Sequence, residues 1–303
     1  MTDIIIVGAG TAGMTAAVYA LRNNKSVLIL ESTSVGGQIA FSPKVENFPS
    51  YTSISGSDFS NRLFEQVLTL GASFELETVT AIVKKEDGNF IVGTDVCEHE
   101  ARAVIIANGV KQKHFPFESE TRLLGNGVYY CAICDGAFYK GREVAVIGDG
   151  NTALQSAILL SSICSKVYVL TLTDKYFGDQ SLIDDLYKTE NIVTISNTSV
   201  TDFLGDDKLT AVKMNHNGKE EVLSVPAVFV AIGQIPDNEK FKNIVTLTKD
   251  GYISANEKTG TSTPGVFAAG DTRNKELRQL ATAVSDGAVA AMNAIEYIRK
   301  TQK

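Results

Sequence analysis

Cysteines are scarce in this chain, and long apolar runs are missing. Four cysteines occur among 303 residues, too few for the disulfide framework of a small secreted protein. The early apolar run at residues 4–7 is far shorter than a membrane span, and it lacks the basic flank of a signal peptide. We therefore expect a cytoplasmic protein with no membrane partner and no targeting segment.

Positive charge is also in deficit. Lys and Arg number 28 against 35 Asp and Glu, a net charge of −7, which argues against nucleic acid as a partner. With 44% hydrophobic and 21% charged residues, the composition is that of an ordinary globular protein. The length suggests about two domains.

Metal-ligand spacing is absent as well. Cys97 and Cys164 have no neighbouring cysteine, and we expect both to be small buried apolar residues. The three histidines, His99, His114 and His216, show no spacing typical of zinc ligands. We predict no metal site in this chain.

The other two cysteines form the motif Cys131-Ala-Ile-Cys134-Asp135. Such a pair can close a reversible disulfide, and if the motif begins a helix, the dipole favours the thiolate. Half of a zinc site is the alternative, but a second ligand pair is missing. Asp135 is either a first-turn acid stabilised by the helix dipole or a proton donor to the dithiol.

A nucleotide-binding pattern lies on each side of the dithiol motif. The first has a strand at residues 3–7, glycines at Gly8, Gly10 and Gly13, a helix at 14–23 and a strand at 26–30 that ends at Glu31. The second has a strand at 143–147, a turn with Gly148, Gly150 and Ala153, a helix to about 162 and a strand at 166–170. Each pattern predicts a Rossmann-like βαβ unit.

Further elements complete the two units. Residues 79–92 predict antiparallel strands around the Asp87-Gly88 turn. Buried strands are expected at 104–109, 228–233 and 266–271, and a helix at 280–300. The sequence therefore predicts an α/β fold with two Rossmann-like nucleotide-binding domains, each three-layered.

The first pattern favours FAD over NAD. The glycines at the start of the helix suit a pyrophosphate, and Glu31 suits a ribose, although a purely structural turn is the alternative. A second glycine-rich turn follows at residues 35–39, and a late strand ends at Asp271, which could bond a ribityl chain.

Several of these motifs together resemble the low-molecular-weight thioredoxin reductases. They are Gly36-Gly-Gln-Ile39, Val45-Glu-Asn-Phe-Pro49, Cys131-x-x-Cys134-Asp135-Gly136, and Gly265 to Asp271 with Arg278-Gln279. The likeness runs from residue 4 to about 290. It implies FAD, a homodimer, and thioredoxin as the disulfide substrate.

The resemblance also implies residue roles. Cys134 would be the sulfur nearest the flavin, Cys131 the sulfur that attacks thioredoxin, and Asp135 the proton donor and acceptor. The implied FAD contacts are Gly8, Gly10, Thr11, Ala12, Gly13, Glu31, Gly37, Gln38, Ile39, Asn47, Asn108, Gly109, Gly270, Asp271, Arg278, Gln279 and Leu280.

The same likeness suggests that one domain is inserted into the other. A discontinuous FAD-binding domain is expected at residues 1–112 and 243–303. The inserted domain at 113–242 would carry the dithiol and an NAD(P)-binding-like fold.

That second domain departs from the family pattern. The NADPH-using members place a His-Arg-Arg run and a further Arg after the second strand, and these cations hold the 2′-phosphate. Here no arginine occurs at residues 143–213, Lys175 is the nearby cation, and Asp174 comes late for a ribose contact. The helix carries Leu154-Gln-Ser156 where the family usually has acidic residues. We expect this domain to bind no nicotinamide nucleotide.

A branch of the family has this character: the pyridine-nucleotide-independent, ferredoxin-linked flavin thioredoxin reductases. The resemblance to that branch implies reduced ferredoxin as the electron donor. The net charge of −7 opposes steering of an acidic ferredoxin. A local basic patch would have to overcome this repulsion. Two groups are candidates for such a patch: Lys111, Lys113 and His114, or Arg273, Lys275 and Arg278.

Two other functions stay open. One is an NAD(P)H-dependent reductase of thioredoxin or a similar disulfide, with atypical nucleotide contacts. The other is a flavin-bound thiol sensor that binds partners without turnover.

Overall fold

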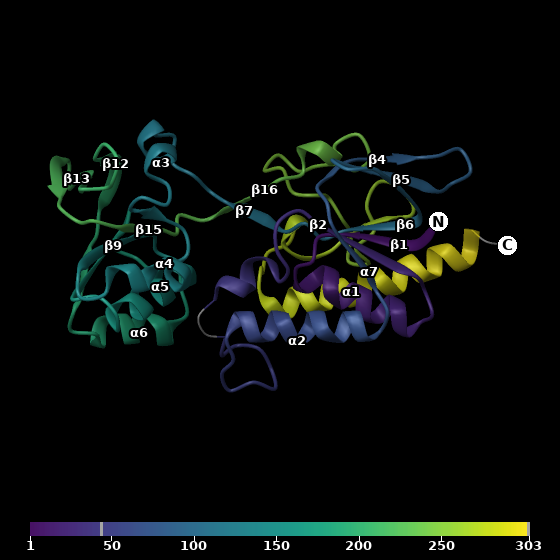
Figure 1. The fold of residues 1–303 in the computed structure, drawn as a ribbon, viewed down its shortest axis with the longest axis horizontal. Coiled ribbons are helices and arrows are strands. Elements are labelled where there is room, and N and C mark those ends of the chain that lie inside the picture. Colours follow the sequence, from purple (N-terminus) through teal and green to yellow (C-terminus); the bar gives the residue numbers. More distant parts are fainter. Residues whose placement is uncertain (43–44, 302–303) are drawn as a thin grey trace. The chain divides into compact units, whose positions relative to one another are not determined.

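Two compact units make up the chain in the computed structural model, which describes residues 1–42 and 45–301 (Figure 1). The first unit comprises Met1–Ala40, Lys44–Lys111 and Ile235–Lys303, and the second comprises Phe41–Pro43 and Gln112–Gln234. The chain passes between the units within two short strands, β7 (Val110–Gln112) and β16 (Gln234–Pro236), which form a two-stranded sheet.

A seven-stranded sheet is the centre of the first unit. Its order is β3-β2-β1-β6-β5-β4, and β17 also pairs with β6. The strands are β1 (Thr2–Val7), β2 (Val27–Glu31), β3 (Ser73–Leu76), β4 (Val79–Lys84), β5 (Phe90–Thr94), β6 (Glu98–Ile106) and β17 (Val266–Ala268). β3, β2, β1, β6 and β17 are parallel, whereas β4 and β5 are antiparallel.

Alternating side chains of β1 enter two separate cores, because successive strand residues point to opposite faces. Ile4 and Ile6 are buried against α1 (Thr11–Arg22) and α7 (Leu280–Thr301). Ile5 and Val7 are buried on the other face with Phe90. α2 (Gly56–Thr69) contributes Val67 to the helical side. The short 3₁₀ helices η3 (Glu239–Phe241) and η4 (Gly270–Thr272) belong to this unit, as do residues 37–40 of η1 (Gly37–Phe41).

The second unit has a parallel five-stranded sheet between two different layers. Its order is β11-β10-β9-β15-β8, with β8 (Val128–Tyr129), β9 (Glu143–Ile147), β10 (Lys166–Leu170), β11 (Ile192–Ile195) and β15 (Val228–Val230). One layer holds α4 (Ala132–Asp135), η2 (Gly136–Tyr139), α5 (Asn151–Ser161) and α6 (Gln180–Lys188). The other holds α3 (Glu118–Leu123) and the antiparallel strands β12 (Thr198–Leu204), β13 (Ala211–His216) and β14 (Lys219–Leu223) (Figure 1).

Most predicted elements are confirmed, and the differences lie at their ends: α1 begins at Thr11 and β6 at Glu98, both earlier than predicted. β9 and β10 have the predicted bounds, and the β4–β5 hairpin and α7 are present. Predicted strands at 104–109, 228–233 and 266–271 end three residues early, because the chain turns out of the sheet near Gly109, Gly233 and Gly270, all with positive φ.

The second domain boundary lies earlier in the chain than residue 243. Residues 235–242 belong to the first unit. The reason is packing, since Phe241 is fully buried in the core that contains Ile5 and Phe90. The assignment of FAD to the first unit, and of the dithiol and an empty nucleotide-type fold to the second, stays a prediction. Among the described residues, no helix is long and apolar enough to cross a membrane.

Candidate functional site

The first glycine turn brings the start of α1 against the ends of β1 and β6. Gly8 has φ +107°, and a Cβ there would lie 2.5 Å from the Ala107 carbonyl oxygen. A Cβ on Gly13 would lie 2.0 Å from the Gly8 oxygen. By contrast, a Cβ on Gly10 would have no heavy atom within 4 Å. Gly8 and Gly13 therefore serve the packing, and Gly10 leaves open space at the N-terminus of a twelve-residue helix.

Glu31 fixes this turn to the end of β2. Its Oε2 accepts a hydrogen bond of 2.7 Å from the Ala9 backbone N–H, and its Oε1 accepts one of 3.0 Å from the Thr33 N–H. The side chain is buried. Glu31 thus holds the Ala9 backbone in addition to its predicted contact with a ribose. The sequence pattern predicted the ribose contact but not the bond to Ala9.

The second glycine-rich turn lies against the first. The Gly36 N–H donates to the Ala9 carbonyl at 2.9 Å, and Gly36 pairs with Gly10 as a parallel bridge. A Cβ on Gly37 would lie 3.3 Å from the Gly10 Cα. Two segments 26 residues apart in the sequence therefore border the open space at Gly10 together.

Asp271 lies in a buried group of charges after β17. Its Oδ1 is buried without a hydrogen-bond partner among the described residues. Lys275 Nζ is 3.5 Å from that oxygen but only 3.1 Å from Asp286 Oδ2. Burial raises the pKa of Asp271, against the opposing charge of Lys275. A buried oxygen that accepts no hydrogen bond, and whose cation is as far as 3.5 Å, is what a ligand hydroxyl would satisfy, so this residue fits the ribityl chain of FAD.

The prediction of a basic surface patch at Arg273, Lys275 and Arg278 is wrong. Arg273 and Lys275 are not a surface group, since the Arg273 residue is 7% exposed and the Lys275 side chain 9%. Both cations pair with Asp286 of α7, at 3.0 and 3.1 Å. The physical reason is that a cation can be buried when carboxylates neutralise it. Lys111, Lys113 and His114 are exposed, as expected.

The remaining predicted FAD residues all lie in the first unit, in three groups. Asn108 donates to Asn238 at 3.2 Å and accepts from Thr272 at 2.8 Å, next to Gly109. Asn47 donates to Gln279 at 3.1 Å, and the Arg278 guanidinium lies 4.0 Å from the Tyr252 ring centre. Gln38 of the third group donates to the Val110 carbonyl at 3.3 Å. That group consists of Thr11, Ala12, Gln38, Ile39, Gly270 and Leu280.

Cys131 and Cys134 form a disulfide at the start of α4. Cys131 is the N-cap of this short helix, and its sulfur accepts a hydrogen bond of 3.1 Å from the Cys134 N–H. Asp135 follows in the same turn, with its N–H bonded to the Cys131 carbonyl at 3.1 Å. Burial raises the pKa of the Asp135 carboxyl. This carboxyl can hold a proton at a higher pH than an exposed aspartate can.

The second glycine turn repeats the backbone of the first but not its chemistry. The Gly148 N–H bonds the Leu170 carbonyl at 3.0 Å, as the Gly8 N–H bonds Leu30 at 2.7 Å. The residue after Leu30 is Glu31, whereas the residue after Leu170 is Thr171, whose hydroxyl bonds the Thr173 carbonyl at 2.6 Å. The ribose-type carboxylate is therefore replaced by a buried threonine.

The segment that follows β10 has no arginine where a 2′-phosphate would need cations, and two of its exposed residues are apolar. Phe177 pairs with Gly150, and its N–H donates to the Asp149 carbonyl at 2.8 Å, yet the residue is 71% exposed. Leu172 is 69% exposed. Within residues 171–179, all of them described, Lys175 is the one Lys or Arg. This surface offers no bidentate partner for a phosphate.

Sequence reasoning missed a third group of reactive side chains. Cys97 is exposed, so the expectation that it is buried is wrong, whereas the same expectation for Cys164 is confirmed. Cys97 misses the core because it follows the turn after β5 and precedes β6. It lies beside His99 and Glu77. The available signal was the short spacing of Cys97 and His99 in the sequence.

The chain matches the pyridine nucleotide-disulphide oxidoreductase family over residues 2–287. A thioredoxin reductase of Listeria innocua is 37% identical, over 99% of this chain and 95% of its own. The thioredoxin reductase structure from Lactococcus lactis has a TM-score of 0.95 at 31% identity, covering 99% of this chain and 100% of its own. The one from T. acidophilum has a TM-score of 0.93 at 36% identity, covering 100% and 99%. A ferredoxin-flavin thioredoxin reductase from Clostridium acetobutylicum is similar at 29% identity, with a TM-score of 0.54 and coverage of 99% and 98%.

Proposed function

Because this chain belongs to the pyridine nucleotide-disulphide oxidoreductase family and is a disulfide oxidoreductase of the thioredoxin reductase type, we propose that it reduces thioredoxin with electrons from reduced ferredoxin. In this proposal NAD(P)H is not the donor. The enzyme acts in the cytoplasm as a homodimer. The Cys131–Cys134 pair transfers the electrons to thioredoxin.

The surface opposite Gly150 is the observation that carries the choice of donor. An NADPH site without its arginines loses two or three charge-assisted contacts, and residues 171–179 of this chain carry Lys175 as their one Lys or Arg. Each such contact is worth about 1.5–3 kcal/mol, so binding weakens by about a hundredfold to a millionfold. The ferredoxin-flavin enzyme of C. acetobutylicum is a more distant neighbour than the thioredoxin reductases of L. lactis and T. acidophilum, so the choice of donor depends on the residues of this chain alone.

FAD is the cofactor of this flavoprotein, and the first unit fits it. The open space at Gly10 suits the pyrophosphate, and the buried Asp271 oxygen that accepts no hydrogen bond suits a hydroxyl of the ribityl chain. When bound, FAD collects single electrons and supplies them as a pair to a disulfide. The protein residues hold this group and exchange the protons.

The proposed reaction balances over the dithiol. Two reduced ferredoxins give one electron each, and with two protons these convert the Cys131–Cys134 disulfide into two thiols. The Cys131 thiolate then attacks a sulfur of the thioredoxin disulfide, and Cys134 resolves the mixed disulfide, so that reduced thioredoxin leaves and the enzyme disulfide re-forms. Asp135, with its raised pKa, exchanges protons with the thiols.

A second candidate is an NAD(P)H-dependent thioredoxin reductase with atypical nucleotide contacts. Two observations favour it: the second turn keeps a nucleotide-type backbone at Gly148, and the family takes its name from a pyridine nucleotide. In that case, contacts other than arginines would hold the nucleotide.

A comparison of electron donors tests the proposal. FAD-loaded protein is assayed anaerobically for thioredoxin reduction with reduced ferredoxin, NADPH or NADH. We expect turnover with ferredoxin and none with either nucleotide at about 1 mM, the upper end of usual KM values. Turnover with NADPH or NADH would establish the second candidate. Absence of turnover with every donor would instead favour the flavin thiol sensor.

A further inference from the structure

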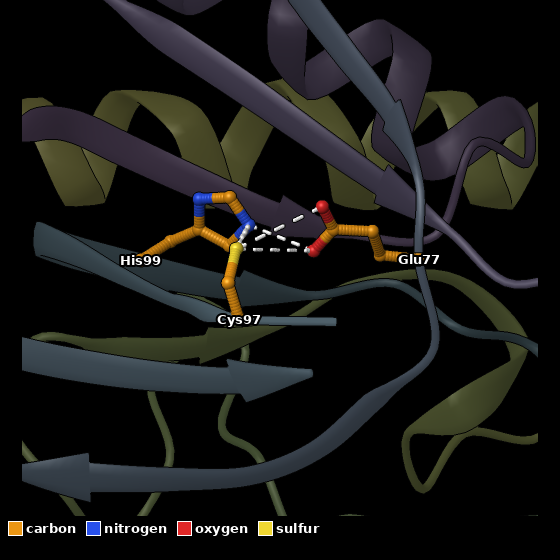
Figure 2. A group of neighbouring side chains, drawn as sticks. All are labelled: Glu77, Cys97 and His99. Carbon is orange, nitrogen blue, oxygen red and sulfur yellow. Dashed lines mark hydrogen bonds and ion pairs between the residues drawn. The ribbon is translucent and has the colours of Figure 1, made fainter. Parts of the chain in front are cut away.

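Glu77, Cys97 and His99 direct three different ligand atoms toward one point on the first unit (Figure 2). His99 Nε2 lies 2.8 Å from Glu77 Oε2 and 3.4 Å from Cys97 Sγ. The Cys97 sulfur lies 3.9 Å from each Glu77 oxygen. All the ligand atoms are within 4.8 Å of one another. Neither the dithiol nor the predicted FAD contacts involve these residues.

Neighbouring residues hold the three side chains in place. The Thr94 hydroxyl donates to Glu77 Oε2 at 2.7 Å and accepts from the Cys97 N–H at 3.0 Å. Thr78 and Asp95 exchange two further bonds, of 2.8 and 3.0 Å, which join the β3–β4 connection to the turn between β5 and β6. The cluster is thus built before any ligand arrives, as metal sites require.

We propose that Glu77, Cys97 and His99 form a site for one Zn²⁺ ion, with a fourth position open to solvent. Zinc accepts thiolate, imidazole and carboxylate together, whereas Ca²⁺ and Mg²⁺ prefer oxygen alone. Ligands of a tetrahedral zinc lie roughly 3.3–3.7 Å apart, given bonds of about 2.0–2.3 Å. The separation of 3.4 Å between Cys97 and His99 lies in that range. On binding, the 2.8 Å hydrogen bond between His99 and Glu77 would open, and the 3.9 Å separation between Cys97 and Glu77 would shorten slightly.

Charge around the cluster also favours a cation. Glu75 acts electrostatically on Cys97, and Asp95 acts on Glu77. A thiolate and a carboxylate together neutralise the two charges of the ion, and His99 binds as neutral imidazole. The bound ion would join the β3–β4 connection to β6 and would cover the exposed thiol of Cys97. This proposal does not depend on the electron donor.

Calorimetric titration with Zn²⁺ tests the site in FAD-loaded, full-length protein. The dithiol is kept as the disulfide so that Cys131 and Cys134 cannot bind metal. We expect one ion per chain, and an affinity lower by about tenfold or more in Cys97→Ser, His99→Gln and Glu77→Gln. Cys164→Ala and His216→Gln are the matched controls, and both should bind like the wild type. Flavin absorbance and melting temperature check that each variant is folded.

Alkylation gives a second, independent readout. Iodoacetamide should modify Cys97, and stoichiometric Zn²⁺ should protect this residue, as read by peptide mass spectrometry. The protection should vanish in His99→Gln, which keeps the thiol. The proposal is overturned if the wild type binds no zinc, if the ligand variants bind it as well as the controls do, or if Cys97 reacts equally with and without the metal.

Discussion

Asp135 is the residue whose chemistry depends most clearly on its surroundings. Burial raises its pKa, so the native state holds a proton over a pH range in which the unfolded chain has lost it. The carboxyl therefore contributes stability that decreases as pH rises through this range. A proton donor near the dithiol gains from the same shift, because it stays protonated at a higher pH.

Asp135→Asn separates these two effects. We expect dithiol reduction by ferredoxin to slow by about a hundredfold or more, and the fall of rate with rising pH to weaken. The free energy of unfolding should not fall, since the variant removes a partly buried charge. Rate against pH and a melting curve measure the two quantities. An unchanged rate would leave Asp135 as no more than a first-turn acid of α4.

Asp271 is the residue whose surroundings give the clearest prediction about FAD binding. Its buried oxygen, which accepts no hydrogen bond, predicts that Asp271→Ala retains FAD about 10–100 times more weakly, the effect of one charge-assisted hydrogen bond. The FAD-free form should also lose stability, because Lys275 and Arg273 would then share Asp286 as their carboxylate partner. Equilibrium dialysis measures FAD retention, and the exposed Asp250→Ala is the control. Equal retention in both variants would remove Asp271 from the flavin contacts.

At the scale of elements, strands buried on both sides were the easiest to predict. β9 and β10 are short apolar runs between glycines and polar residues, and their bounds agree with the sequence. The charged residues after β17 were harder. Arg273 and Lys275 resemble a surface patch in sequence, but Asp286, a turn and a half into α7, neutralises them both. Sequence spacing does not reveal such a pairing.

The Glu77, Cys97 and His99 cluster was missed for a related reason. Glu77 and Cys97 are 20 residues apart, and the intervening β4–β5 hairpin brings them together. Their separation thus depends on how a hairpin folds back along the sheet. A search for metal ligands by short spacing alone could find only the Cys97-x-His99 pair.

The start of α1 offers a prediction about packing. A Cβ on Gly13 would overlap the Gly8 oxygen, so Gly13→Ala should lower the free energy of unfolding by about 1–3 kcal/mol, even without FAD. Gly10→Ala meets no atom and should leave the FAD-free protein folded, but its methyl group would fill the space meant for the pyrophosphate. Denaturant titration and FAD retention distinguish them. Equal effects of the two variants on stability would contradict this division of roles.

At the scale of the whole molecule, one backbone pattern occurs twice with different consequences. Gly10 and Gly150 each precede a helix, and each has open space where a Cβ would stand. The first turn is accompanied by Glu31 and a second glycine-rich segment. The second is accompanied by Thr171 and the exposed Phe177. The shared backbone was predictable from sequence. The proposal that no nicotinamide nucleotide binds at the second turn depends on the missing arginines. The fold does not require these arginines, so it forms without them.

Matched alanine variants at these two turns therefore test the electron route. If FAD binds at Gly10 and no nucleotide binds at Gly150, Gly10→Ala should weaken FAD retention, and Gly150→Ala should leave ferredoxin-driven thioredoxin reduction unchanged. Both variants keep the dithiol, so Cys131→Ser and Cys134→Ser serve as controls that lose turnover with any donor. If Gly150→Ala instead impaired turnover while FAD content and melting temperature stayed constant, the second turn would be part of the working enzyme. A nicotinamide nucleotide would then be the first ligand to seek there, because the helix start at Gly150 is built as the one at Gly10 is.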